Sequence, residues 1–188
     1  MLKELVTESR SVRSFRQDRI PEETLRELVG VARLCPAAMN LQPLKYHLIT
    51  EPEECRRLLA ITHWAGSLSI KLPPAGHEPV AYIVVCHDTS IAPEKPIFMI
   101  DVGIVSQTIM LAARERGLGG CIIGSASEEN IRQTLALPAG IVPKLILALG
   151  VPDEQIRLVE AKDGEVRYYR DENNVHYVPK RPIEELLV

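Results

Sequence analysis

The stretch IFMIDVGIVSQTIMLAARERG, residues 97–117, is long, apolar on almost every side when drawn as a helix, and ends at Gly117. Before Arg114 it carries a single charged residue, Asp101. A helix with no polar face must be covered on all sides. In a chain of 188 residues, a partner subunit is a natural source of that cover. The stretch therefore predicts a central helix in an oligomeric fold.

Around this helix, shorter apolar patterns predict a mixture of helices and strands. The sequence PEETLRELVGVARL, residues 21–34, has its apolar residues on one stripe and predicts an amphipathic helix that Pro36 stops. The run VAYIVVCHD, residues 80–88, predicts a strand buried on both faces. Helices and strands do not alternate strictly, so the pattern favours an α+β fold with helices around a mixed sheet. Further helices are expected over 2–8, 52–64 and 127–137, and further strands over 44–50, 117–124 and 143–152.

The remaining segments read as loops and surface strands. Residues 66–79 carry two glycines and three prolines, which is typical of a long loop and often of a lid or binding segment. Asp163-Gly164 predicts a hairpin turn, and the alternation over 168–178 predicts a strand whose charges face solvent. We find no repeats and no low-complexity linker, so residues 1–188 are expected to form a single domain.

Composition excludes several classes of function. Lys and Arg number 22 against 25 Asp and Glu, for a net charge of −3, so no basic excess supports nucleic-acid binding. No apolar run approaches the ~20 residues that span a bilayer, and the N-terminus lacks an apolar signal core. The four cysteines are too widely spaced for a zinc site or a disulfide scaffold. A cytoplasmic protein with reduced thiols, bound neither to nucleic acid nor to a membrane, is the expectation.

Two short segments carry chemistry. In RSVRSF, residues 10–15, two arginines bracket Ser11, and this combination of guanidinium forks, a hydroxyl and backbone N–H groups can hold a phosphate. In PAAMNLQP, residues 36–43, small residues permit close backbone approach to a flat ligand, and two amide side chains can pair with a heterocycle. Sequences typical of P-loops, Rossmann phosphate loops, zinc proteases and serine hydrolases are absent.

The ordered set RSVRSF, PAAMNLQP, LAARERGLGGCIIG and VPKRP resembles the nitroreductase family of FMN-dependent oxidoreductases over essentially the whole chain. The resemblance implies a mainly antiparallel mixed sheet flanked by helices and an intertwined homodimer. It also implies FMN bound at the subunit interface, reduced by NADH or NADPH, with a small electron-poor acceptor of the nitroaromatic or quinone type.

The resemblance also implies roles for individual residues. Arg10 and Ser11 match positions that hold the FMN phosphate, and Arg13 matches the basic residue near the N1/O2 edge of the flavin. Arg181, with Lys180 beside it, matches a C-terminal arginine that returns to the phosphate. The family segment that reaches the flavin from the opposite subunit corresponds to four residues of this chain: Pro36, Ala37, Ala38 and Asn40. The stretch along the flavin near N5 matches Cys121, Ile122, Ile123 and Gly124.

The physical chemistry of flavins supports this assignment. Reduced FMN tends to carry negative charge at N1, which a cation such as Arg13 stabilises. Because the flavin performs the chemistry, no acid–base pair of catalytic side chains is expected. Two alternatives use the same motifs: a non-catalytic module that stores, senses or delivers FMN, and a flavoenzyme of the reductive dehalogenase type.

Three other residues have structural interpretations beside functional ones. The apolar surroundings of Cys121 favour an inert buried thiol over a redox group. Asp101 is expected to make a structural hydrogen bond. Trp64, at the expected end of helix 52–64, either shapes the substrate face together with loop 66–79 or simply anchors the helix.

Overall fold

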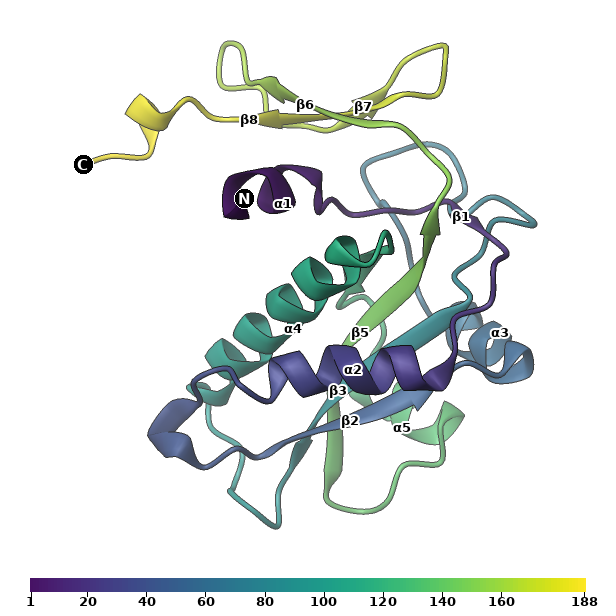
Figure 1. Cartoon of the computed structure of the whole chain (residues 1–188), viewed down its shortest axis with the longest axis vertical. Coiled ribbons are helices and arrows are strands. Elements are labelled where there is room, and N and C mark those ends of the chain that lie inside the picture. The colour runs from purple at the N-terminus through teal and green to yellow at the C-terminus, as the bar shows by residue number, and fades with distance from the viewer.

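An antiparallel five-stranded sheet forms the centre of the computed structural model, which describes all residues from Met1 to Val188 (Figure 1). The longest strand, β5, pairs with β3 on one side and with β4 on the other, while β2 extends the sheet beyond β3. The end of β5 also pairs with the short β1. The bounds are β1 (Phe15–Arg16), β2 (Leu44–Ile49), β3 (Ala81–Asp88), β4 (Gly119–Ile123) and β5 (Ile141–Pro152).

Helices cover both faces of this sheet. One core cluster joins α2 (Glu22–Ala32) and α4 (Phe98–Glu115) to one face. A second cluster joins α3 (Pro52–Ala60) and α5 (Glu128–Thr134) to the other. Because both faces are covered, every residue of β3 from Ala81 to His87 is buried, as its apolar run predicts.

The N-terminal helix lies beside the carboxyl end of α4, and the C-terminal strands lie beyond this helix at the top of the view (Figure 1). Helix α1 (Leu2–Glu8) is fixed there by an ion pair of 2.9 Å between Glu8 and Arg114. A second sheet has the order β6-β8-β7, with β6 and β8 parallel and β7 and β8 antiparallel. Its strands are β6 (Ile156–Glu160), β7 (Tyr169–Arg170) and β8 (His176–Lys180), and the short 3-10 helices are η1 (Ala38–Asn40) and η2 (Ile183–Glu185).

The α+β class is confirmed and the expected helices and strands form, but one helix ends earlier than expected, the strand over 168–178 is divided into β7 and β8, and one pairing differs. Helix α3 stops at Ala60, so His63 and Trp64 lie in the following loop. The Thr62 hydroxyl accepts a bond from the indole of Trp64 (2.8 Å) and donates to the Leu59 carbonyl (2.8 Å), which together stabilise a non-helical path. The Asp163-Gly164 turn has the expected positive φ values of 52° and 73°. However, β6 and β7 do not pair with each other, because β8 lies between them.

One expectation about exposure was wrong. The charges of residues 168–178 do not all face solvent, since the side chain of Arg170 is only 7 % exposed. Helix α4 leaves apolar side chains exposed in the single chain, since Met99 and Ile100 are 47 % and 57 % exposed, and their cover by a partner subunit stays a prediction. No helix in the structure is both long enough and apolar enough to cross a membrane.

Candidate functional site

The segment 10–13, which contains Arg10 and Arg13, is hydrogen-bonded to the first half of β4. The Val12 N–H donates to the Gly120 carbonyl at 2.8 Å, and Ser11 forms a parallel bridge with Gly120. A side chain at Gly120 would place its Cβ 2.1 Å from a backbone oxygen of β5, so this close strand packing requires glycine. The contact joins segments more than a hundred residues apart and brings Ser11 and Arg13 beside Cys121.

Arg10 is turned back towards α1. Its Nε donates to the Ser9 carbonyl at 2.6 Å and its Nη2 donates to the Val6 carbonyl at 2.7 Å. The guanidinium therefore satisfies carbonyls at the end of the helix, where a cation is favoured. Partial burial lowers the pKa of Arg10. No carboxylate pairs with it, so the cation keeps donors for an anionic ligand.

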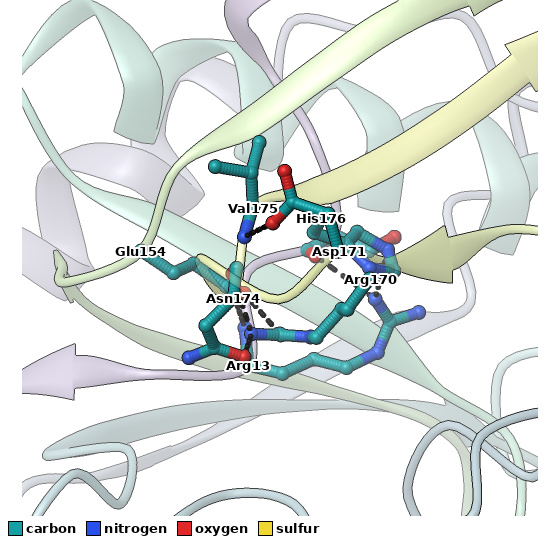
Figure 2. A network of polar contacts seen from close by, with 8 residues as sticks. Arg13, Glu154, Arg170, Asp171, Asn174, Val175 and His176 are labelled. Carbon is teal, nitrogen blue, oxygen red and sulfur yellow. Dashed lines mark hydrogen bonds and ion pairs between the residues drawn. The ribbon is translucent and has the colours of Figure 1, made fainter.

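Arg13 is held by groups from the second sheet (Figure 2). Its Nη1 lies 3.3 Å from Nε2 of His176, and its guanidinium carbon lies 5.3 Å from the ring centre of Tyr168. Its backbone N–H donates to Glu154, which also accepts from Arg170. The orientation of Arg13 is therefore set by residues from the C-terminal quarter of the chain.

Glu154 and Arg170 are functional candidates that the sequence pattern did not reveal. Their side chains are 2 % and 7 % exposed and form a buried ion pair. Arg170 also donates to Asn174 Oδ1 at 2.9 Å (Figure 2). Only the tertiary fold joins these residues to Arg13, and no local spacing in the sequence indicates the pair.

His176 is buried and neutral at physiological pH. Burial, together with the positive charges of Arg13 and Arg170, lowers its pKa from 6.5 to about 4. Because Nε2 faces a guanidinium N–H, it acts as acceptor and the ring proton lies on Nδ1. That Nδ1–H and the Nε–H of Arg13 are buried donors without a partner.

The β4 residues differ in what they present. Cys121 is buried, and burial raises the pKa of its thiol, which agrees with the interpretation of an inert group. Ile123 also packs into the core, so this position can offer a ligand only its backbone. Ile122 is 39 % exposed and Gly124 is exposed, so the open side of β4 lies at these two positions.

The segment Pro36–Asn40 lies at the opposite end of α4 from Arg13. Both carboxylate oxygens of buried Asp101 accept from the Ala38 N–H at 3.0 Å, which confirms a structural hydrogen bond for Asp101. Arg114, which anchors α1, is thirteen residues further along α4, a rise of about 20 Å. One protomer therefore does not bring Pro36, Ala37, Ala38 and Asn40 to the site of Arg13.

The C-terminal cations are also separate from Arg10. Lys180 ends β8 opposite Glu160, and Arg181 forms an exposed ion pair of 2.8 Å with Glu185. No hydrogen bond or ion pair joins either residue to Arg10 or Ser11, so their predicted return to a phosphate remains a prediction.

The group that the resemblance implies, FMN, fits the residues around Arg13. Two guanidiniums without a carboxylate partner lie on either side of the exposed Ser11. Two further buried N–H donors, on Arg13 and His176, have no acceptor. Buried donors are almost always paired in native proteins, so an excess of donors with net positive charge matches an acceptor-rich anion.

Comparisons with known proteins show the family and the fold. The Nitroreductase family profile matches residues 6–71 and 77–151. A protein of Methanothermobacter thermautotrophicus, provisionally named NADH dehydrogenase/NAD(P)H nitroreductase, is 27 % identical over 155 residues, covering 80 % of this chain and 77 % of the relative.

Solved structures have the same fold. The nitroreductase family protein of Streptococcus pneumoniae TIGR4 superposes with a TM-score of 0.73 at 16 % identity, covering 100 % of this chain and 99 % of its own. The FMN-dependent nitroreductase NfnB of Mycobacterium smegmatis, solved in complex with NADPH, gives 0.65 at 19 % identity, covering 81 % and 87 %.

Fold and site together define an α+β protein with the nitroreductase fold. The chain belongs to the nitroreductase family, as the sequence motifs predicted.

Proposed function

We propose that this protein is an FMN-dependent oxidoreductase that takes hydride from NADH or NADPH and passes it to a small electron-poor acceptor of the nitroaromatic or quinone type. One observation carries the proposal. The fold bonds the segment 10–13 to β4, and the guanidinium groups of Arg10 and Arg13 have no carboxylate partner. The names of two relatives, which include NAD(P)H nitroreductase and FMN-dependent nitroreductase, support the same activity class.

The proposed active form is an intertwined homodimer with FMN at the interface. The segment Pro36–Asn40 and Arg13 lie at opposite ends of α4, so both can touch one flavin only if they come from different copies. The exposed apolar residues near that segment support such an interface. Leu34 and Met39 are 73 % and 68 % exposed, and Ile100 of α4 is 57 % exposed.

Each part of the chain has a defined task in this proposal. Bound FMN would supply hydride transfer at its N5. Arg10 and Ser11 hold the phosphate, and Lys180 and Arg181 are proposed to join them from the C-terminus. Arg13 supplies positive charge where the flavin pyrimidine becomes negative on reduction.

Neutral His176 keeps the Arg13 cation oriented without adding a second charge. The backbone of the β4 segment, Cys121, Ile122, Ile123 and Gly124, lines the flavin near N5. The small Pro36, Ala37 and Ala38, with Asn40, complete the site from the partner copy.

An absorbance spectrum of the purified protein, followed by anaerobic titration with NADH and with NADPH, tests the proposal. We expect a bound flavin spectrum that bleaches with at least one donor and returns when a quinone is added. A flavin that binds but stays oxidised with both donors would instead identify a storage or sensor module. A protein that binds no flavin would contradict both.

A further inference from the structure

A cavity on the α3 side of the sheet is not part of the site described above. Its volume is about 730 Å³, within the range of small-molecule sites. It is lined by residues of α3, of loop 62–80 and of the segment that follows β1. None of the residues predicted to hold FMN lines it.

Part of the cavity wall is apolar. Four prolines line it, together with Leu59 and Trp64, the only tryptophan of the chain. The indole N–H of Trp64 is bonded to Thr62 at 2.8 Å, which fixes the ring against the cavity. Proline and indole rings are surfaces on which an aromatic ring packs well.

The charge of the lining is unbalanced. Arg19, Arg56 and Lys71 line the cavity against a single carboxylate, Glu78, although the chain as a whole has a net charge of −3. Arg56 is paired with Glu53 on α3. Arg19 and Lys71 form neither an ion pair nor a side-chain hydrogen bond, and Asp18 beside Arg19 is paired with Arg16 at 2.6 Å.

A buried hydroxyl behind the wall is also without a partner. Tyr82 is fully buried, and its OH group makes no hydrogen bond. Burial, and proximity to Cys55 and Glu78, raise the pKa of this phenol. Both neighbours line the cavity, whereas Tyr82 itself lies behind the lining residues.

The loop that closes the cavity is fixed at both sides. The His63 N–H donates to Ser125 Oγ at 2.9 Å, and Ser125 Oγ donates to the His63 carbonyl at 2.8 Å. At the other side, Arg167 Nη2 donates to the Ser67 carbonyl at 2.9 Å. These contacts fix the position of the loop beside the cavity.

We propose that this cavity binds a small organic anion with an aromatic body, of the aromatic carboxylate class, at a site separate from the FMN residues. The ring packs against Trp64 and the prolines, and the carboxylate is held by Arg19 and Lys71. The proposal does not depend on FMN binding, so it can fail or succeed independently of the proposed oxidoreductase activity.

The test uses benzoate as the probe and benzamide as a neutral molecule of similar shape. Binding to the full chain is measured by calorimetry and by the fluorescence of Trp64, with and without saturating FMN. We expect saturable benzoate binding, a change in fluorescence, and much weaker binding of benzamide. Arg19→Ala and Lys71→Ala should each weaken binding about 5-fold.

A matched control and a gain-of-affinity variant complete the design. Lys162→Ala removes an exposed cation that is not part of the cavity lining and should bind benzoate as the wild type does. Glu78→Gln removes the only carboxylate of the lining and should tighten binding about 3-fold. Because this variant predicts tighter binding, it tests the proposal even if Arg19→Ala fails to fold.

Three results would overturn the proposal. The first is no saturable binding of benzoate. The second is equal binding of benzamide, or equal effects of the Lys71 and Lys162 substitutions. The third is complete loss of benzoate binding when FMN is added, because the cavity would then be part of the flavin site.

Discussion

Replacing His176 by glutamine removes one titration from the folded protein and leaves an acceptor for Arg13. In the wild-type protein, the imidazole is buried near Arg13 and Arg170, and the Tyr168 ring lies 5.3 Å from it. Glu154 accepts from the backbone N–H of Arg13 and from the guanidinium of Arg170. These surroundings exclude the charged imidazolium. Glutamine cannot titrate, and its amide oxygen can still accept from the guanidinium.

The magnitude follows from the pKa of His176, which burial and the two arginines lower from 6.5 to about 4. Between these values the unfolded chain binds more protons than the folded one, so the free energy of unfolding falls as pH decreases through this window. Between pH 7 and pH 5 the loss amounts to about 2 kcal/mol for this one residue. Above pH 6.5, the pKa in the unfolded chain, His176 is neutral in both states and this loss of unfolding free energy is absent.

The assay is urea unfolding of the wild type and of His176→Gln at both pH values. Each protein loses stability through its other groups, but these losses are common to both and cancel in the difference. The wild type should lose about 2 kcal/mol more than the variant. His63→Gln, at an exposed histidine, is the control and should behave as the wild type. Equal losses in the wild type and in His176→Gln would refute the reasoning.

Three further changes test the site and its packing. Arg170→Ala leaves the Glu154 carboxylate buried without its cation and should cost about 3–5 kcal/mol in urea unfolding; a cost below about 1 kcal/mol would contradict a buried ion pair. Gly120→Ala places a methyl carbon 2.1 Å from a backbone oxygen and should destabilise by about 2–4 kcal/mol, whereas Gly30→Ala, in open space on α2, should stabilise by up to about 1 kcal/mol. Arg13→Ala should weaken FMN binding about 10-fold in a fluorescence titration while the circular dichroism spectrum stays unchanged, and unaltered FMN affinity would exclude its proposed role.

Local patterns predicted most of the fold. Residues 80–88 were recognised as a doubly buried strand because an uninterrupted apolar run has no solvent face, and the structure confirms it. The amphipathic stripe of residues 21–34 likewise predicted α2. The end of α3 was missed because side-chain bonds at Thr62 and the positive φ of 46° at Ala65 redirect the chain, which periodicity does not detect.

The candidate site was predictable only where its residues are close in sequence. Arg10, Ser11 and Arg13 were found because they share one short segment. Glu154 was not, because it is 141 residues from Arg13, to whose backbone it bonds. The burial of Arg170 depends on the packing of the second sheet, which no local pattern encodes.

A subunit-mixing experiment tests most directly whether two copies share each flavin. Arg13→Ala disables one half of the site, and Ala37→Glu, at a half-buried position, disables the other half. Mixed dimers of the two variants are isolated with distinct affinity tags, and bound FMN per dimer is measured by absorbance. A site built from two copies predicts about one FMN bound with wild-type affinity per mixed dimer, whereas FMN binds only with weakened affinity in either parent dimer. Mixed dimers that bind no more FMN than the parents would contradict the shared site.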